Sequence, residues 1–170
     1  MKTGKINIST EEIIKHIRHR SYMSGVERDR NRIIATGEVY TPTEEVLKFI
    51  NEIPQHIWTN PKSTFADTEG CGDGQFLGEI LIKRVESGID FETALSTIFG
   101  IEKEPDNAEL CRNRLLCNQE QFRSIVNKNI VTADSDFYHG RFDGTAPDPE
   151  GVAKLAPGVS NLFENWYEDQ

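Results

Sequence analysis

The chain has 170 residues, a hydrophobic fraction of 36% and a formal net charge of −9. This length suits one domain with a real core, and no apolar run is long enough to span a membrane or to act as a signal peptide. Its three cysteines form no metal-ligand pattern, and an odd number of thiols without a secretory signal favours a reducing, cytoplasmic setting.

Charge is distributed unevenly along the chain. Residues 1–36 carry eight Lys/Arg against four Asp/Glu, whereas residues 37–170 carry eleven against twenty-four. Phosphate binding depends on Lys and Arg, so the acidic part is not expected to grip nucleic acid by itself. The basic segment could contact DNA, or its charges could simply be solvated. We therefore divide the chain into a basic helical arm (1–36), a core (37–138) and an acidic tail rich in Gly and Pro (139–170).

The arm is predicted to be one helix. Ser9–Glu12 reads as a capping box, and the helix is expected to continue to about Arg32. It should dock by its first turns, through a short apolar stripe of Ile13, Ile14 and Ile17. His16 and His19 could face one another, but no Cys or acidic partner completes a metal site, so we predict none.

A second helix is expected to begin at Thr41 and to stop near Pro54. Thr41 can cap it, Pro42 suits the first helical position, and Glu44 closes a capping box. Apolar residues then recur at helical spacing and should pack on the core: Val46, Leu47, Ile50 and Ile53. A turn at residues 60–62 leads to the first predicted strand, at about 63–67.

A glycine-dense turn follows that strand. Gly70, Gly72 and Gly74 tolerate positive φ and let the backbone approach a ligand closely. A helix with a buried face should then run to Gly88, which acts as its cap. Further along we predict a short helix (91–96), a strand (97–102), a helix opening at Pro105, and a strand (129–133). This alternation predicts an α/β domain with a parallel sheet. Beyond residue 138 only a short helix at 161–167 is suggested.

Each predicted strand ends in an acidic residue: Asp67, Glu102 or Asp134. Because ligands of open parallel sheets bind outside the carboxyl ends of the strands, these three carboxylates should meet the hydrogen-bond donors of one nucleoside. The turn lacks the G-x-G-x-x-G spacing of dinucleotide sites, no Walker lysine follows it, and Asp73 would repel a pyrophosphate. A ligand that carries a sulfonium and an ammonium suits such a pocket better.

Together with the upstream run Gly37-Glu38-Val39-Tyr40-Thr41-Pro42, these segments resemble the cofactor half of adenine-specific DNA methyltransferases that use S-adenosylmethionine. The resemblance covers about residues 32–138. It implies a Rossmann-like parallel sheet of the class I methyltransferase type, here with three readable strands where a complete sheet has seven. One departure is Thr68-Glu69, where the family usually has Pro and a small residue; the added carboxylate could face the ammonium of the cofactor or water.

The resemblance also implies roles for individual residues. Asp67 and the glycine turn would hold the methionine part of the cofactor. Glu102, flanked by Lys103, would accept both ribose hydroxyls, and Asp134 would accept from the adenine amine. The full cofactor set implied in this way is Tyr40, Thr41, Pro42, Asp67, Gly70, Gly72, Gly74, Phe76, Glu102, Lys103, Asp134 and Phe137.

The target-base motif of the family, Asn/Asp-Pro-Pro-aromatic, is absent. Its nearest register is Asp148-Pro149, which keeps an acidic residue and one proline and is our candidate for the catalytic pair. Three functions therefore stay open. The first is a methyltransferase that is DNA adenine-specific by descent, with its target half in the tail or in a partner chain. The others are an inactive module that binds S-adenosylmethionine or a protein, and an enzyme that acts on the cofactor or on a small molecule. Missing strands would leave open sheet edges, which favours self-association or a partner subunit.

Overall fold

The structure is a computed structural model that describes residues 8–19, 41–135 and 138. In chain order its elements are α1 (Thr10–His19), α3 (Thr43–Asn51), α4 (Gln55–Thr59), β1 (Phe65–Asp67), α5 (Gln75–Glu86), α6 (Phe91–Ser96), β2 (Ile98–Glu102), α7 (Pro105–Leu116), the 3₁₀ helix η2 (Glu120–Phe122), α8 (Arg123–Asn129) and β3 (Ile130–Thr132).

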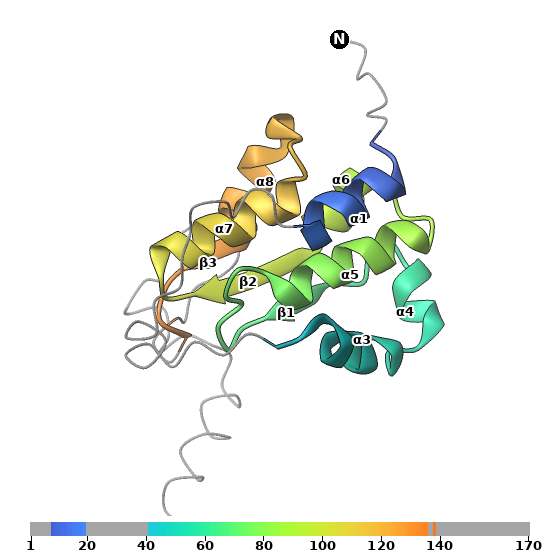
Figure 1. The fold of residues 1–170 in the computed structure, drawn as a ribbon, viewed down its shortest axis with the longest axis horizontal. Coiled ribbons are helices and arrows are strands. Elements are labelled where there is room, and N and C mark those ends of the chain that lie inside the picture. Colours follow the sequence, from blue (N-terminus) through green and yellow to red (C-terminus); the bar gives the residue numbers. More distant parts are fainter. Residues whose placement is uncertain (1–7, 20–40, 136–137, 139–170) are drawn as a thin grey trace, which may run out of the picture.

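The three strands form one parallel sheet in the order β1-β2-β3. In its register, Phe65 lies beside Ile98 and Gly100 lies beside Ile130. Helices α5 and α7 cross one face of this sheet, and α1 lies beside them (Figure 1). The fold is thus α/β with a small parallel sheet, as the alternation of strand and helix patterns predicted.

The arm docks through its first helix. Ser9 and Glu12 form the predicted capping box, because the Glu12 carboxylate accepts from the Ser9 backbone N–H at 2.8 Å. Ile13 and Ile17 are fully buried. The pair between Arg18 and the buried Glu79 of α5 adds a bidentate contact with distances of 3.1 and 2.8 Å. The predicted continuation to Arg32 lies outside the described residues.

The glycine turn has the backbone that its composition predicted. Gly70, Gly72 and Gly74 adopt φ values of +110°, +55° and +82°. Gly74 is the N-cap of α5, and a Cβ there would lie 2.8 Å from the sulfur of Cys111. The other end of α5 is also as expected, because Gly88 (φ +88°) follows its last turn and donates to the Val85 carbonyl.

Several boundaries differ from the predictions. Helix α3 begins at Thr43, because Pro42 has an extended ψ of 145° and serves as the N-cap without a side-chain bond; the predicted cap at Thr41 is wrong. Asn129 belongs to α8 and not to the third strand. Helices α4 and α8 were not predicted, since five and seven residues are too few for helical periodicity to show.

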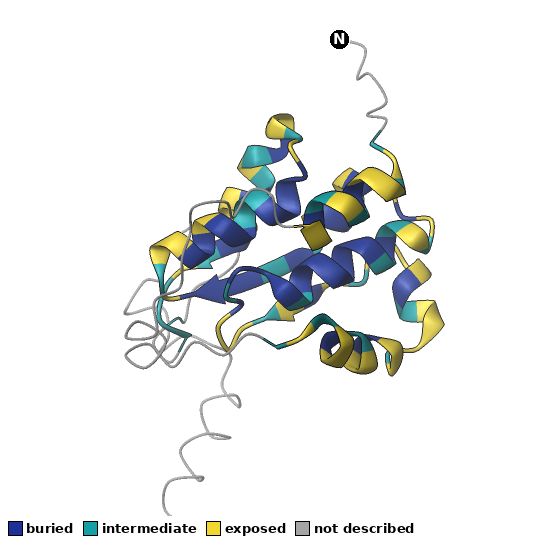
Figure 2. Ribbon diagram, viewed as in Figure 1, coloured by how far each residue is buried: buried dark blue, intermediate teal, exposed yellow. Residues whose placement is uncertain are grey.

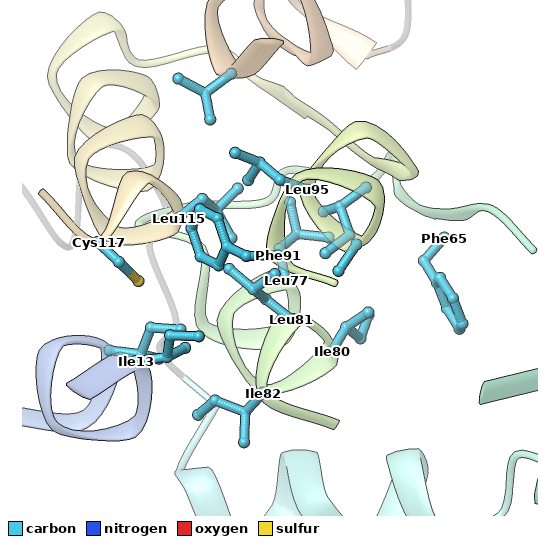
Figure 3. Packing of buried hydrophobic residues seen from close by; sticks show 14 of the residues in the cluster. Ile13, Phe65, Leu77, Ile80, Leu81, Ile82, Phe91, Leu95, Leu115 and Cys117 are labelled. Atoms are coloured by element: carbon cyan, nitrogen blue, oxygen red, sulfur yellow. The ribbon is translucent and has the colours of Figure 1, made fainter. Parts of the chain in front are cut away.

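The core extends from α1 to β3. Buried residues gather where α5 and α7 face the sheet (Figure 2), and Leu77, Leu81, Leu95 and Leu115 meet there with Ile13 of α1 nearby (Figure 3). At the edge of the core, Trp58 stacks on Phe65 with ring centroids 4.9 Å apart. The buried Arg84 donates to the carbonyls of Trp58 and Asn60 at 2.8 and 2.7 Å, which anchors α4 to α5. No helix in the described ranges is both long and apolar enough to cross a membrane.

Candidate functional site

A cavity of about 430 Å³ lies at the carboxyl ends of the strands, where ligands of parallel sheets bind. Its volume falls within the range of small-molecule sites, roughly 300–1,000 Å³. Its lining is formed by Thr41, Asp67, Glu69, Gly70, Cys71, Gly72, Asp73, Gln75, Phe76, Ile101, Glu102, Lys103, Glu104, Asn107, Ala133, Asp134 and Ser135. Six of these side chains are carboxylates and one is a lysine, so the lining favours a cationic ligand.

Glu102, at the end of β2, is held in place by backbone groups. One carboxylate oxygen accepts from the Gly72 N–H at 2.7 Å, and the other accepts from the Glu104 N–H at 2.8 Å. The residue is buried. Each oxygen of a carboxylate can accept more than one hydrogen bond, so both retain capacity for donors from a ligand. Glu102 is therefore an oriented double acceptor, which suits a pair of vicinal hydroxyls.

Asp67, at the end of β1, is a half-buried carboxyl among other acids. Its removal from water raises its pKa above the ordinary value of 3.8, a bond from the Glu69 backbone acts in the opposite direction, and repulsion by Glu102 and Glu69 raises it further. A cation placed here would relieve that repulsion. The protein therefore carries an electrostatic cost at Asp67 that a positively charged ligand would offset.

The third carboxylate, Asp134, comes just after β3. The Ala133 N–H donates to the Glu102 carbonyl at 2.9 Å, which keeps this segment beside β2. Asp134 forms an ion pair with Lys103 at 2.7 Å, and both residues line the cavity. Lys103, predicted to flank the ribose site, thus also faces the residue predicted to read the adenine amine.

Asp73 has a different role from the one predicted. It lines the cavity, but its fully buried side chain pairs with the equally buried Arg114 at 3.1 Å. Because Arg114 balances its charge, Asp73 gives no reason to exclude a phosphate ligand. The prediction that Asp73 repels a pyrophosphate is therefore wrong. The sequence offered no sign of this pair, since its partners are 41 residues apart.

Cys71 is a packing residue of the turn. Its sulfur lies 3.9 Å from that of Cys111, and its backbone N–H donates to the Ile101 carbonyl at 2.8 Å. The contact with Cys111 and burial raise the pKa of the Cys71 thiol, so it remains protonated and is a poor nucleophile. A Cβ at Gly100 of β2 would lie 2.8 Å from the Cys71 sulfur and from a methyl group of Leu77, so a larger residue there would have to displace these side chains.

Most of the predicted cofactor residues that the structure describes line this one cavity: Thr41, Asp67, Gly70, Gly72, Phe76, Glu102, Lys103 and Asp134. Pro42 and Gly74 do not line it, although their neighbours Thr41 and Gln75 do. The remaining predictions, Tyr40, Phe137, Asp148 and Pro149, lie outside the described residues. Three further residues that line the cavity were not predicted: Gln75 after the glycine turn, Glu104 after β2, and Asn107 in the first turn of α7. None of them belongs to a recognisable sequence motif.

The basic arm is described over residues 8–19, where its polar side chains serve docking. Arg18 pairs with Glu79, and the Nε2 of His16 lies 3.1 Å from the carbonyl oxygen of Asn113. Within the described part of the chain, no group of three or more His, Cys, Asp or Glu side chains is arranged to hold a metal.

Comparison of the chain with protein-family models, with curated proteins and with solved structures gave no match. The function is therefore inferred from the geometry of the cavity and from the residues that line it.

Proposed function

We propose that the protein binds S-adenosylmethionine in this cavity and is a methyltransferase-like protein with a Rossmann-like core, DNA adenine-specific by descent. One observation carries the proposal. The carboxylates that end the three strands, Asp67, Glu102 and Asp134, surround a single cavity beside a turn of positive-φ glycines.

The order of the strands, β1-β2-β3, supports the proposal because it sets the three carboxylates in the order methionine, ribose, adenine along the sheet. Glu102 presents two fixed oxygens to the ribose hydroxyls. Asp134 can accept a hydrogen bond from the adenine amine, either beside its ion pair with Lys103 or after Lys103 moves away. Asp67, the glycine turn, Thr41 and Phe76 line the same cavity, and an ammonium and a sulfonium beside Asp67 would reduce the carboxylate repulsion.

Methyl transfer to an amine needs further groups that orient the acceptor. The candidate pair Asp148 and Pro149 lies outside the described residues. A second candidate function is an inactive binding module, because the Asn/Asp-Pro-Pro-aromatic motif of the family is absent from the sequence. The cavity by itself supplies acceptors for the cofactor, which such a module also needs.

A partner chain is part of this proposal. Among the described residues, β1 pairs with β2 on one side and no strand pairs with its other side. Ala66 in this strand is exposed. Open strand edges accept further strands, so we expect self-association or a partner subunit that completes the sheet. Light scattering of the purified protein over a range of concentrations measures the first of these.

The first test is calorimetric titration with S-adenosylmethionine and with its demethylated product. Asp67→Ala and Glu102→Ala should each abolish binding in a folded protein. Asp90→Ala is the control: Asp90 caps α6 by accepting from the Thr93 N–H and does not line the cavity, so its loss should lower stability and leave affinity unchanged. Binding by both cavity variants at the affinity of the parent would show that the site is elsewhere.

The second test separates the candidate activities. The protein is incubated with methyl-labelled cofactor, with and without adenine-containing DNA. Label in DNA supports the methyltransferase, binding without transfer supports the inactive module, and turnover without an acceptor supports an enzyme that acts on the cofactor itself.

A further inference from the structure

We propose that Gln75 is a positioning residue that ties the two walls of the cavity together through Thr43 and Arg114. The identity of the ligand rests on the proposed function, but the mechanical link does not. One wall is the glycine turn; the other, the α3 wall, is Thr41, which lines the cavity two residues before α3 begins at Thr43.

Gln75 makes a bond in each direction. Its side-chain oxygen accepts from the Nη2 of Arg114 at 2.6 Å, and its amide nitrogen donates to the Thr43 hydroxyl at 2.7 Å. Because a guanidinium has donors and no acceptor, the contact with Arg114 determines which end of the amide is the oxygen. The NH₂ group is thereby directed at Thr43.

Arg114 carries the link onward to the turn. Its Nη1 donates to the Asp73 carboxylate at 3.1 Å. The Arg114 side chain is 1% exposed and the Asp73 side chain is fully buried. Asp73 lies between two glycines of positive φ, and the N–H of Gly72 holds Glu102. These hydrogen bonds, together with the peptide bond between Gly72 and Asp73, connect the start of α3 to the carboxylate that ends β2.

The contacts through Gln75 and Arg114 should hold the glycine turn in one conformation before a ligand binds. Glycines have more backbone freedom to lose than other residues, so a turn with three of them is costly to order when a ligand binds. Buried contacts that order it beforehand shift that cost from binding to folding. The bond between Gln75 and Thr43 also keeps the α3 wall at a set distance from the turn, so that both walls are in place before the ligand enters.

The test uses a matched pair at Thr43. Thr43→Val keeps the shape and removes the acceptor, whereas Thr43→Ser keeps the hydroxyl. Gln75→Leu removes the link itself. Two quantities are measured: calorimetric affinity for S-adenosylmethionine, and hydrogen exchange of the backbone amides at residues 70–74 without ligand.

We expect Thr43→Val to weaken binding about five- to tenfold, the effect of one lost hydrogen bond between neutral groups. Gln75→Leu also removes the acceptor of Arg114, so it should weaken binding at least as much. Both should speed exchange in the turn, and Thr43→Ser should match the parent in both measurements. Parent-like affinity and exchange in Thr43→Val would overturn the inference. So would a defect in Gln75→Leu alone, since that result shows that the bond to Thr43 has no effect on the cavity. If the parent itself does not bind S-adenosylmethionine, the proposed function fails, and the exchange rates still decide whether the link exists.

Discussion

The buried pair of Asp73 and Arg114 supplies the largest single effect that the structure predicts. Replacing Arg114 by Met removes the positive charge that pairs with the fully buried Asp73 carboxylate. Removal of one partner from a buried pair costs about 3–5 kcal/mol. A domain of this kind has a total stability of about 5–15 kcal/mol, so Arg114→Met should be close to the limit of folding.

A double-mutant cycle separates the charge from the packing. Asp73→Asn combined with Arg114→Met buries no charge, so the pair of changes should cost less than the sum of the two single changes, by about 2 kcal/mol. If the two costs simply add, the charges do not interact and the reasoning is wrong.

Urea unfolding followed by tryptophan fluorescence measures these differences, because Trp58 is buried in the core beside Phe65. With a slope of about 1.5 kcal/mol per molar urea, a loss of about 4 kcal/mol lowers the midpoint by roughly 2.7 M. A shift below about 0.7 M for Arg114→Met would refute the assignment of a buried, charge-dependent pair at the turn.

Three further changes test other parts of the structure. Because burial and neighbouring acids raise the pKa of Asp67, the folded protein holds that proton more tightly than the unfolded chain and loses stability as pH rises through the raised pKa. Asp67→Asn should therefore be more stable than the parent at neutral pH, and this difference should vanish well below pH 3.8, while the variant loses cofactor affinity. Thermal unfolding with the same difference at both pH values would contradict this. Gly74→Ala should cost about 2–4 kcal/mol, since it adds a contact at 2.8 Å with the Cys111 sulfur to the strain of positive φ. Gly88→Ala is its matched control, with a similar φ and open space, and should lose only about 1–2 kcal/mol in urea unfolding; equal losses would argue against the contact. Arg84→Met should cost about 2–3 kcal/mol by leaving buried carbonyls of the α4 region without their donor, yet keep cofactor affinity in calorimetry, because Arg84 does not line the cavity.

Much of the fold could be read from local patterns. The capping box at Ser9, the glycine at position 88 and the apolar face of α5 each act within a few residues, and each is present in the structure. The short helices α4 and α8 escaped prediction because they are held by packing, with Trp58 and Val126 buried, rather than by a repeating pattern of their own.

The candidate site also has one part that the sequence predicted and one part that it did not. The convergence of Asp67, Glu102 and Asp134 followed from strand order alone, since parallel strands bring their carboxyl ends to one edge. The charge state of that edge did not follow. Asp73 is balanced by Arg114, and Asp134 by Lys103, so this edge carries less uncompensated negative charge than its acidic residues alone would suggest.

The amino-acid sequence by itself thus determined where the chain turns, which residues end the strands and which glycines open the backbone beside them, because those properties depend on near neighbours. Only the tertiary structure decided that Asp73 pairs with an arginine, whereas Asp67 lies in the cavity among other acids. That difference depends on residues far apart in the chain, whose distances are set when α7 and α3 pack against α5.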